Sequence, residues 1–138
     1  MNKTLLLVLL FLMTGTLMAQ EPGITQQAPQ AKVTPLMSKD LTELPGKEVV
    51  MIAVEYPPGS ADPIHRHNAQ AFVYVMEGSI VMQVKGEKEV TLTRGQTFYE
   101  GPDDVHLVGR NASSTQPAKF LVVLVKGKGA PVLTPVPK

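Results

Sequence analysis

The three histidines of the chain, His65, His67 and His106, are the first residues to consider, because only one residue separates two of them. Residues i and i+2 of an extended segment point to the same face, so His65 and His67 can bring two imidazoles to one point. Neutral imidazole is a ligand for Zn, Cu, Fe and Ni. The pair therefore indicates a metal site rather than a nucleophile with its base, and His106 is the candidate third ligand. Two exposed loop histidines are the alternative.

The composition narrows the possible functions. The chain has 138 residues, enough for one domain, and carries 13 Lys and Arg against 12 Asp and Glu. This balance gives no electrostatic basis for binding nucleic acid. Because the chain has no cysteine, an oxidising compartment would supply no disulfides. Stability must then come from a hydrophobic core, to which a bound metal or a partner subunit can add.

Residues 1–19 have the organisation of a secretory signal peptide. Lys3 precedes a short apolar run, and the small residue Ala19 offers a cleavage point. The run is shorter than the ~20 apolar residues of a membrane-spanning helix. We therefore expect export, to the periplasm or the medium, with no stable membrane anchor after cleavage; an uncleaved anchor is the alternative. Residues 20–35 are polar with recurring proline, which predicts a flexible leader.

The remaining sequence has an all-β pattern. Short runs rich in β-branched and aromatic residues alternate with turns that contain glycine or proline, and no segment has a sustained helical period. This spacing predicts a sandwich or small barrel over residues 36–128. Runs 49–56 and 120–125 are apolar on both faces, so one face can fill the barrel while the other packs on a second sheet or on another subunit. We therefore expect a homodimer, and an extended tail over residues 129–138.

The histidine pair and the glycines around it resemble the first motif of the cupin superfamily, whose members are small jelly-roll or double-stranded β-helix barrels. That motif is G-x5-H-x-H-x3,4-E-x6-G, and Gly59, His65, His67 and Gly78 match its spacing. The resemblance implies a cupin barrel that holds a divalent transition metal (Fe, Mn, Zn, Ni or Cu) through its histidines.

A second cupin motif, G-x5-P-x-G-x2-H-x3-N, is matched less completely. Gly95 and His106 have the family spacing. Pro102 is displaced by one position, Asp103 stands where glycine is usual, and Asn111 comes one residue late. The two motifs together use every histidine of the chain.

The departure from the first motif concerns its glutamate, a metal ligand in many cupins, which falls at Ala71. Three hypotheses follow. In the first, His65, His67 and His106 alone hold the metal and leave positions open to water or substrate. In the second, the amide oxygen of Gln70 completes a four-ligand site, which requires a bulge because strict alternation points Gln70 away from the histidines. In the third, the site has degenerated.

Two glutamates on strands near the motifs, Glu55 and Glu100, are candidates for supporting roles. Either could accept a hydrogen bond from an imidazole N–H or act as a general base; a charge on the rim of the barrel is the alternative. The resemblance favours dioxygenase-like or isomerase-like activity on a small organic molecule. A non-catalytic cupin that binds or senses a small ligand is the competing hypothesis, and a structural barrel with vestigial histidines is a third.

Overall fold

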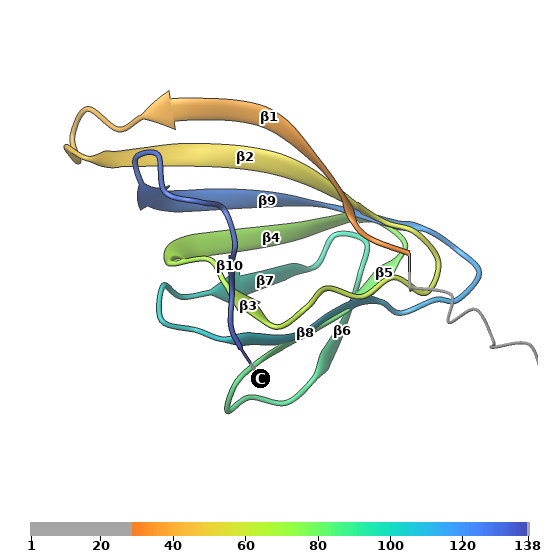
Figure 1. The fold of residues 1–138 in the computed structure, drawn as a ribbon. Coiled ribbons are helices and arrows are strands. Elements are labelled where there is room, and N and C mark those ends of the chain that lie inside the picture. Colours follow the sequence, from red (N-terminus) through yellow and green to blue (C-terminus); the bar gives the residue numbers. More distant parts are fainter. Residues whose placement is uncertain (1–28, 138) are drawn as a thin grey trace, which may run out of the picture.

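The computed structural model describes residues 29–137, and these residues form ten β-strands with no helix among them (Figure 1). Within this range, accordingly, no helix is long and apolar enough to cross a membrane. The strands are β1 (Lys32–Asp40), β2 (Lys47–Tyr56), β3 (His65–Arg66), β4 (Ala69–Glu77), β5 (Ser79–Val84), β6 (Val90–Thr93), β7 (Thr97–Glu100), β8 (His106–Asn111), β9 (Ala118–Gly127) and β10 (Thr134–Pro135).

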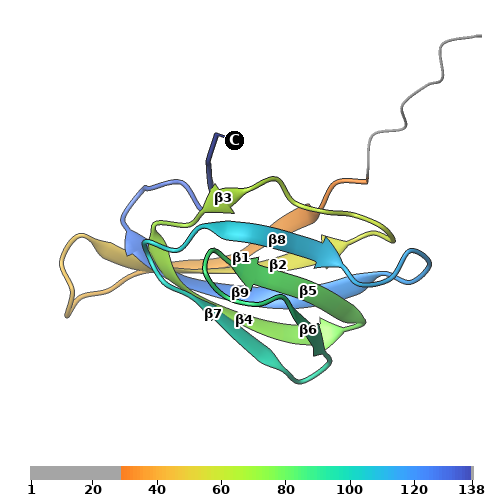
Figure 2. The same cartoon turned by 90° about the horizontal axis from the view of Figure 1, so that it is seen from below.

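The strands form two antiparallel five-stranded sheets that pack against each other (Figures 1 and 2). The strand order is β1-β2-β9-β4-β7 in the first sheet and β10-β3-β8-β5-β6 in the second. Neighbours in space are mostly distant in sequence, as in a jelly roll. This confirms the predicted all-β double-stranded β-helix.

The core lies between the sheets because the strands alternate in polarity. Along β9, Phe120, Val122 and Leu124 point inward and are buried, while the residues between them are half-buried on the outer face. Along β4, Ala71 and Val73 are buried in the same way. Residues of a strand point alternately to opposite faces, so each of these strands fills the barrel with one set of side chains and presents a second set outside.

The domain begins earlier than the sequence indicates. Strand β1 starts at Lys32 and pairs with β2 from Lys32 onward, so residues 32–35 of the expected leader belong to the first sheet. The sequence of this strand lacks an alternating apolar pattern because its side chains are almost all exposed. It also contains Pro35, a residue that edge strands tolerate. The expected signal peptide, residues 1–19, lies outside the described range.

The tail after β9 folds back on its own domain. Its short strand β10 pairs with β3, with Pro135 opposite His65, and Figure 1 shows this segment running from the end of β9 across to the second sheet. Where the tail begins, the buried Lys126 ammonium donates hydrogen bonds to the Glu48 carboxylate and to the Ala130 carbonyl. The tail therefore forms a strap beside the strand that carries the first histidine.

A candidate metal centre

The structure gathers the three histidines and one glutamate inside the barrel. His65 lies on β3 directly opposite His106 on β8, His67 follows β3, and Glu100 ends β7. One ligand atom from each of these four residues lies within 4.8 Å of all the others. His65, Glu100 and His106 are at most 3% exposed. The expected convergence of His65 and His67 is confirmed, and His106 joins them.

The spacing of the ligand atoms fits one ion. His65 Nε2 lies 3.2 Å from both His67 Nε2 and His106 Nδ1. Glu100 Oε2 lies 3.3 Å from His106 Nδ1 and 3.6 Å from His67 Nε2. Two ligand atoms each ~2.1 Å from a common ion, and 90–120° apart around it, are separated by about 3.0 to 3.6 Å. Four of the six separations fall in this range, and the other two are no longer than 4.8 Å.

Hydrogen bonds on the outer side of two rings fix which nitrogen faces inward. His65 Nδ1 lies 2.8 Å from the Pro63 carbonyl, and His67 Nδ1 lies 2.7 Å from the Val132 carbonyl. A carbonyl oxygen only accepts, so each Nδ1 must carry the proton and each Nε2 must present a lone pair. Two lone pairs 3.2 Å apart repel each other unless a cation lies between them. The arrangement therefore suits a cation.

His106 is turned the other way, with Nδ1 toward the cluster. Its outer Nε2 is buried without a hydrogen-bond partner among the described residues. Gly109 makes room for the ring: a β-carbon there would lie 2.9 Å from His106 Cε1 and 3.0 Å from the Tyr56 hydroxyl. The His106 ring can therefore take this position only because residue 109 has no side chain.

Burial disfavours the charged forms of His67, His106 and Glu100 by shifting their pKa values. It lowers the pKa of His106 to about 3, with a further contribution from the His65 imidazole, and it lowers the pKa of His67. Burial also raises the pKa of the Glu100 carboxyl to about 7, and the charges of Asp104 and Asp62 act in the same direction. Neutral imidazole is the form that binds metal. A bound cation would in turn favour the charged form of the carboxylate.

Gln70, the fourth ligand of the second hypothesis, is not brought to the cluster. It is exposed on the outer face of β4 and accepts a hydrogen bond from the Tyr99 hydroxyl. The bulge required to turn it inward does not occur there, because β4 keeps strict register with β9 from Ala69 to Val75. Alternation along the strand therefore decides against Gln70.

Glu100 supplies the carboxylate from the neighbouring strand. In the register of β4 and β7, Glu100 pairs directly with Ala71, the position where the motif glutamate falls. Both residues are buried, so both point into the barrel. The sequence had suggested Glu100 only as a supporting acceptor or base, because nothing in a single sequence gives the register between these two strands. The other candidate, Glu55, is partly exposed and pairs with Lys32 and Lys119, away from the cluster.

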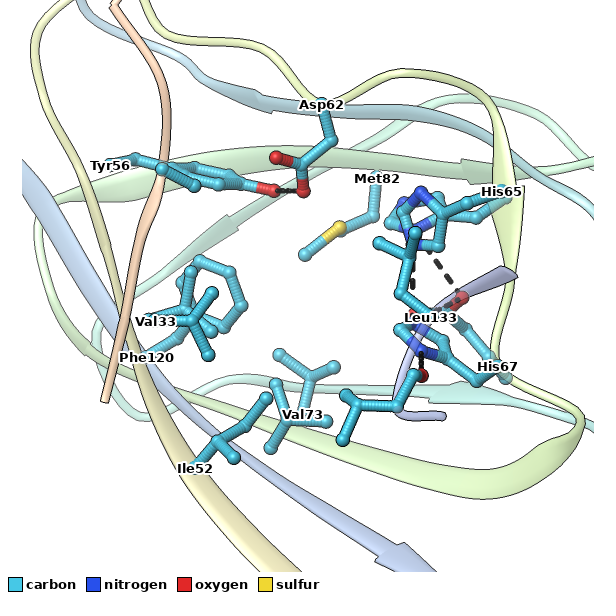
Figure 3. Close-up of a pocket in the computed structure, with 16 residues that line it drawn as sticks. Val33, Ile52, Tyr56, Asp62, His65, His67, Val73, Met82, Phe120 and Leu133 are labelled. Carbon is cyan, nitrogen blue, oxygen red and sulfur yellow. Dashed lines mark hydrogen bonds and ion pairs between the residues drawn. The ribbon is translucent and has the colours of Figure 1, made fainter. Parts of the chain in front are cut away.

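The cluster opens into a cavity of about 210 Å³ (Figure 3). Its lining is mostly apolar, and both ends of the described chain contribute to it: Val33 from β1, and Val132 and Leu133 from the strap. Besides the candidate ligands, its polar lining residues are Tyr56 and Asp62, whose side chains are hydrogen-bonded to each other. A small organic molecule in this cavity would lie next to the ion.

The fold is a double-stranded β-helix barrel made of two antiparallel sheets. Three imidazoles and a carboxylate point into it and could hold a metal ion. The family model of the cupin domain matches residues 52–124, and the chain belongs to the cupin family. No curated protein matches its sequence.

Solved structures with the same fold include proteins of several bacteria. A double-stranded β-helix protein from Klebsiella pneumoniae is 17% identical, with a TM-score of 0.63 over 82% of this chain and 90% of that one. A cupin-domain protein from Bordetella pertussis is 24% identical, with a TM-score of 0.57 over 74% and 99%. A DMSP lyase from Ruegeria pomeroyi is 19% identical, with a TM-score of 0.56; the match covers 64% of this chain and 43% of the lyase. These similarities establish the fold.

Proposed function

We propose that this cupin binds a divalent transition metal through His65, His67, His106 and Glu100, and acts on a small organic molecule in the adjoining cavity. The observation that carries the proposal is the meeting of two Nε2 lone pairs, each fixed by a carbonyl on the outer side of its ring. Iron, manganese, nickel, copper and zinc all accept such nitrogen and oxygen ligands. A resident ion of this kind supplies Lewis-acid polarisation or oxygen chemistry to a bound substrate, which matches the dioxygenase-like or isomerase-like activity expected from the sequence.

The first experiment is elemental analysis of untagged protein purified without chelator, alongside His65→Ala and the surface control Lys39→Ala. Near-stoichiometric metal in the native protein and the control, lost in His65→Ala, supports the proposal. A native protein that neither carries a transition metal nor takes one up refutes it. The metal found would also separate oxygen chemistry, which needs a redox-active ion, from Lewis-acid chemistry.

A non-catalytic binding module is the second candidate, and the number of protein ligands favours it. Four protein ligands close a tetrahedral ion, as in structural zinc sites, whereas catalytic sites keep a position open. An ion that prefers six ligands would keep two positions for substrate. Zinc in the purified protein, together with a cavity ligand recovered unchanged, would favour the binding module.

We further propose that two copies pair through the outer face of the first sheet. Phe72, Tyr74 and Tyr99 are each about half exposed there, beside Leu121 and Val123 in a shallow hollow. An exposed apolar patch on a sheet is typical of an interface, and a two-fold dimer uses one patch twice. Light scattering should give a dimer mass for the native protein and a monomer mass for Tyr74→Glu. A monomeric native protein at micromolar concentration would exclude this pairing.

Export remains a proposal that rests on residues 1–19 of the sequence. Expression of the full chain in a bacterial host, followed by fractionation and N-terminal sequencing, tests it. Protein that begins at Gln20 in the periplasm or the medium would support cleavage after Ala19. Full-length protein that stays with the cells would contradict it.

A further inference from the structure

Tyr56 and Asp62 form a second polar group in the cavity, beside the metal cluster. Figure 3 shows the Tyr56 hydroxyl directed at the Asp62 carboxylate, with Ile52 and Val73 across the cavity from them. Tyr56 is 1% exposed, and its ring meets Phe120 edge-on at 4.9 Å, so its hydroxyl is held in place. Polar groups in an apolar site cost free energy unless they are hydrogen-bonded. The Tyr56 hydroxyl meets this condition through Asp62, so the question is what else the carboxylate can bind.

A purely structural role is disfavoured because the loop that carries Asp62 is already fixed by other bonds. The Asp62 amide donates to the Gly109 carbonyl, and the Asn111 amide donates to the Ser60 carbonyl. The Asn111 side chain also donates to the carbonyls of Tyr56 and Pro57. None of these bonds uses the Asp62 carboxylate. The loop would therefore keep its path without it.

The Asp62 carboxylate has accepting capacity left. A carboxylate offers about four lone-pair positions, and among the described residues only the Tyr56 hydroxyl donates to it. Asp62 lines the cavity together with the metal ligands. A donor group on a molecule in the cavity can therefore bind to it, while Tyr56 keeps the carboxylate oriented.

This acceptor lines the same cavity as the four candidate metal ligands. The Tyr56 hydroxyl and the His106 ring both lie against Gly109, 3.0 and 2.9 Å from where a β-carbon there would stand. The four ligands would leave a divalent ion with a net charge of about +1, because three imidazoles are neutral and one carboxylate is charged. The cavity thus offers a positive pole and, beside it, a hydrogen-bond acceptor, with apolar walls elsewhere.

We propose that Asp62, positioned by the Tyr56 hydroxyl, accepts a hydrogen bond from a hydroxyl or ammonium group of a small ligand whose carboxylate or other oxygen group binds at the metal. This inference rests on the proposed metal site and specifies the class of molecule for it: a short, largely apolar compound with an oxygen group at one end and a donor at the other. The cavity is smaller than the ~300–1,000 Å³ typical of drug-sized ligands, which restricts the ligand to few carbon atoms.

The test uses pairs of probes on the metal-loaded protein. We would titrate the ω-hydroxy acids from hydroxyacetate to 6-hydroxyhexanoate by calorimetry, each against the acid whose terminal hydroxyl is replaced by a methyl group. At the length that spans the site, the hydroxy acid should bind about 10- to 100-fold more tightly, as expected for a hydrogen bond to a charged group. The corresponding ω-amino acids show whether an ammonium serves better than a hydroxyl. Equal affinity within every pair, or no binding at all, would overturn the proposal.

Variants then locate the effect. In Asp62→Asn the preference for the hydroxy acid should fall about 10-fold, because a neutral amide oxygen accepts a weaker hydrogen bond than a carboxylate, while the metal content stays unchanged. In Tyr56→Phe it should weaken without vanishing, because the carboxylate remains but loses its orientation. Asp103→Asn, which removes the same charge from an exposed turn, is the matched control. A preference of native size in Asp62→Asn would refute the role of Asp62.

The two proposals fail in different ways. Absence of metal from the native protein would remove the metal site and this inference with it. A fully metal-loaded protein without any preference between paired probes would leave the metal site intact and overturn the inference alone. The comparison of probes on the native protein needs no variant, so it stays decisive even where a substitution prevents folding.

Discussion

Moving a carboxylate between two paired strands would test the candidate metal centre most directly. Ala71 and Glu100 face each other across β4 and β7, and both point into the barrel. Glu100→Ala removes the one carboxylate of the cluster, whereas Ala71→Glu in that background returns a carboxylate from the strand where the family motif carries it. Metal binding should therefore be lost in the first variant and partly recovered in the second.

The structure sets the scale of these changes. Glu100 Oε2 lies 3.3 and 3.6 Å from two imidazole nitrogens, as a direct ligand should. Loss of an outer-sphere partner costs about 10- to 100-fold in metal affinity, so loss of a direct ligand should cost at least ~100-fold, or about 2.8 kcal/mol. Ala71→Glu alone adds a side chain at a fully buried position and should destabilise the fold by about 1–3 kcal/mol. The double variant roughly conserves volume, so its stability should recover as well.

The assay is competition for the metal against a chelator of known affinity, with thermal unfolding of each metal-free variant as the control for folding. Metal affinity should fall in Glu100→Ala. The double variant Ala71→Glu/Glu100→Ala should bind metal at least ~10-fold more tightly than the sum of the two single-variant effects predicts. Gln70→Ala should bind metal like the native protein. Native affinity in a folded Glu100→Ala variant would show that the carboxylate is not a ligand. A large loss in Gln70→Ala would contradict its exposed position.

Three further predictions follow from the surroundings of the cluster. Gly109→Ala should destabilise the protein by about 1–3 kcal/mol through overpacking, because its β-carbon would clash with the His106 ring; denaturant unfolding measures this, and an unchanged midpoint would contradict it. Deletion of residues 131–138 removes the carbonyl acceptor of His67. Metal affinity, measured by competition with a chelator, should fall about 10- to 100-fold. Native affinity in the shortened protein would show that the strap does not support the site. The hydrogen bond from Lys126, aided by the Gly129 amide, lowers the pKa of Glu48 from 4.5 to about 2. The Glu48 carboxylate therefore stabilises the fold above about pH 4.5, and this stabilisation is lost as the pH falls toward 2. Glu48→Gln should flatten the acid-unfolding curve in that window, and an unaltered slope would contradict the assignment.

Local pattern was sufficient to predict the all-β class and the convergence of His65 and His67, and the resemblance to the cupin motifs added the double-stranded β-helix and supported His106. Strand runs and turn residues are local signals, and the alternation of side chains along a strand places His65 and His67 on one face whatever the rest of the chain does. The same alternation already argued against Gln70. The structure agrees with the sequence at these points because each depends only on residues close together along the chain.

The remaining features depend on pairing between distant strands. Glu100 becomes a candidate ligand only because β7 pairs with β4 in a register that sets it opposite Ala71. The strap supplies the acceptor for His67 from a residue 65 positions away. Strand register is fixed by the packing of the whole barrel, and a single sequence contains no local signal for it. The carboxylate and the outer-sphere acceptors could therefore be recognised only from the fold.

Relocation of the carboxylate has a consequence for the shape of the site. A small residue at position 71 and a glutamate on the neighbouring strand would keep the same four groups around a bound ion, but the carboxylate lies on β7 and not on β4. The space beside the ion that stays open to a ligand depends on the direction from which each ligand arrives. In this chain that space is bordered by Tyr56, Asp62 and the strap. Reverting the carboxylate to position 71 should therefore change the preference among cavity probes even where metal affinity recovers, which separates the geometry of the ligand set from its chemistry.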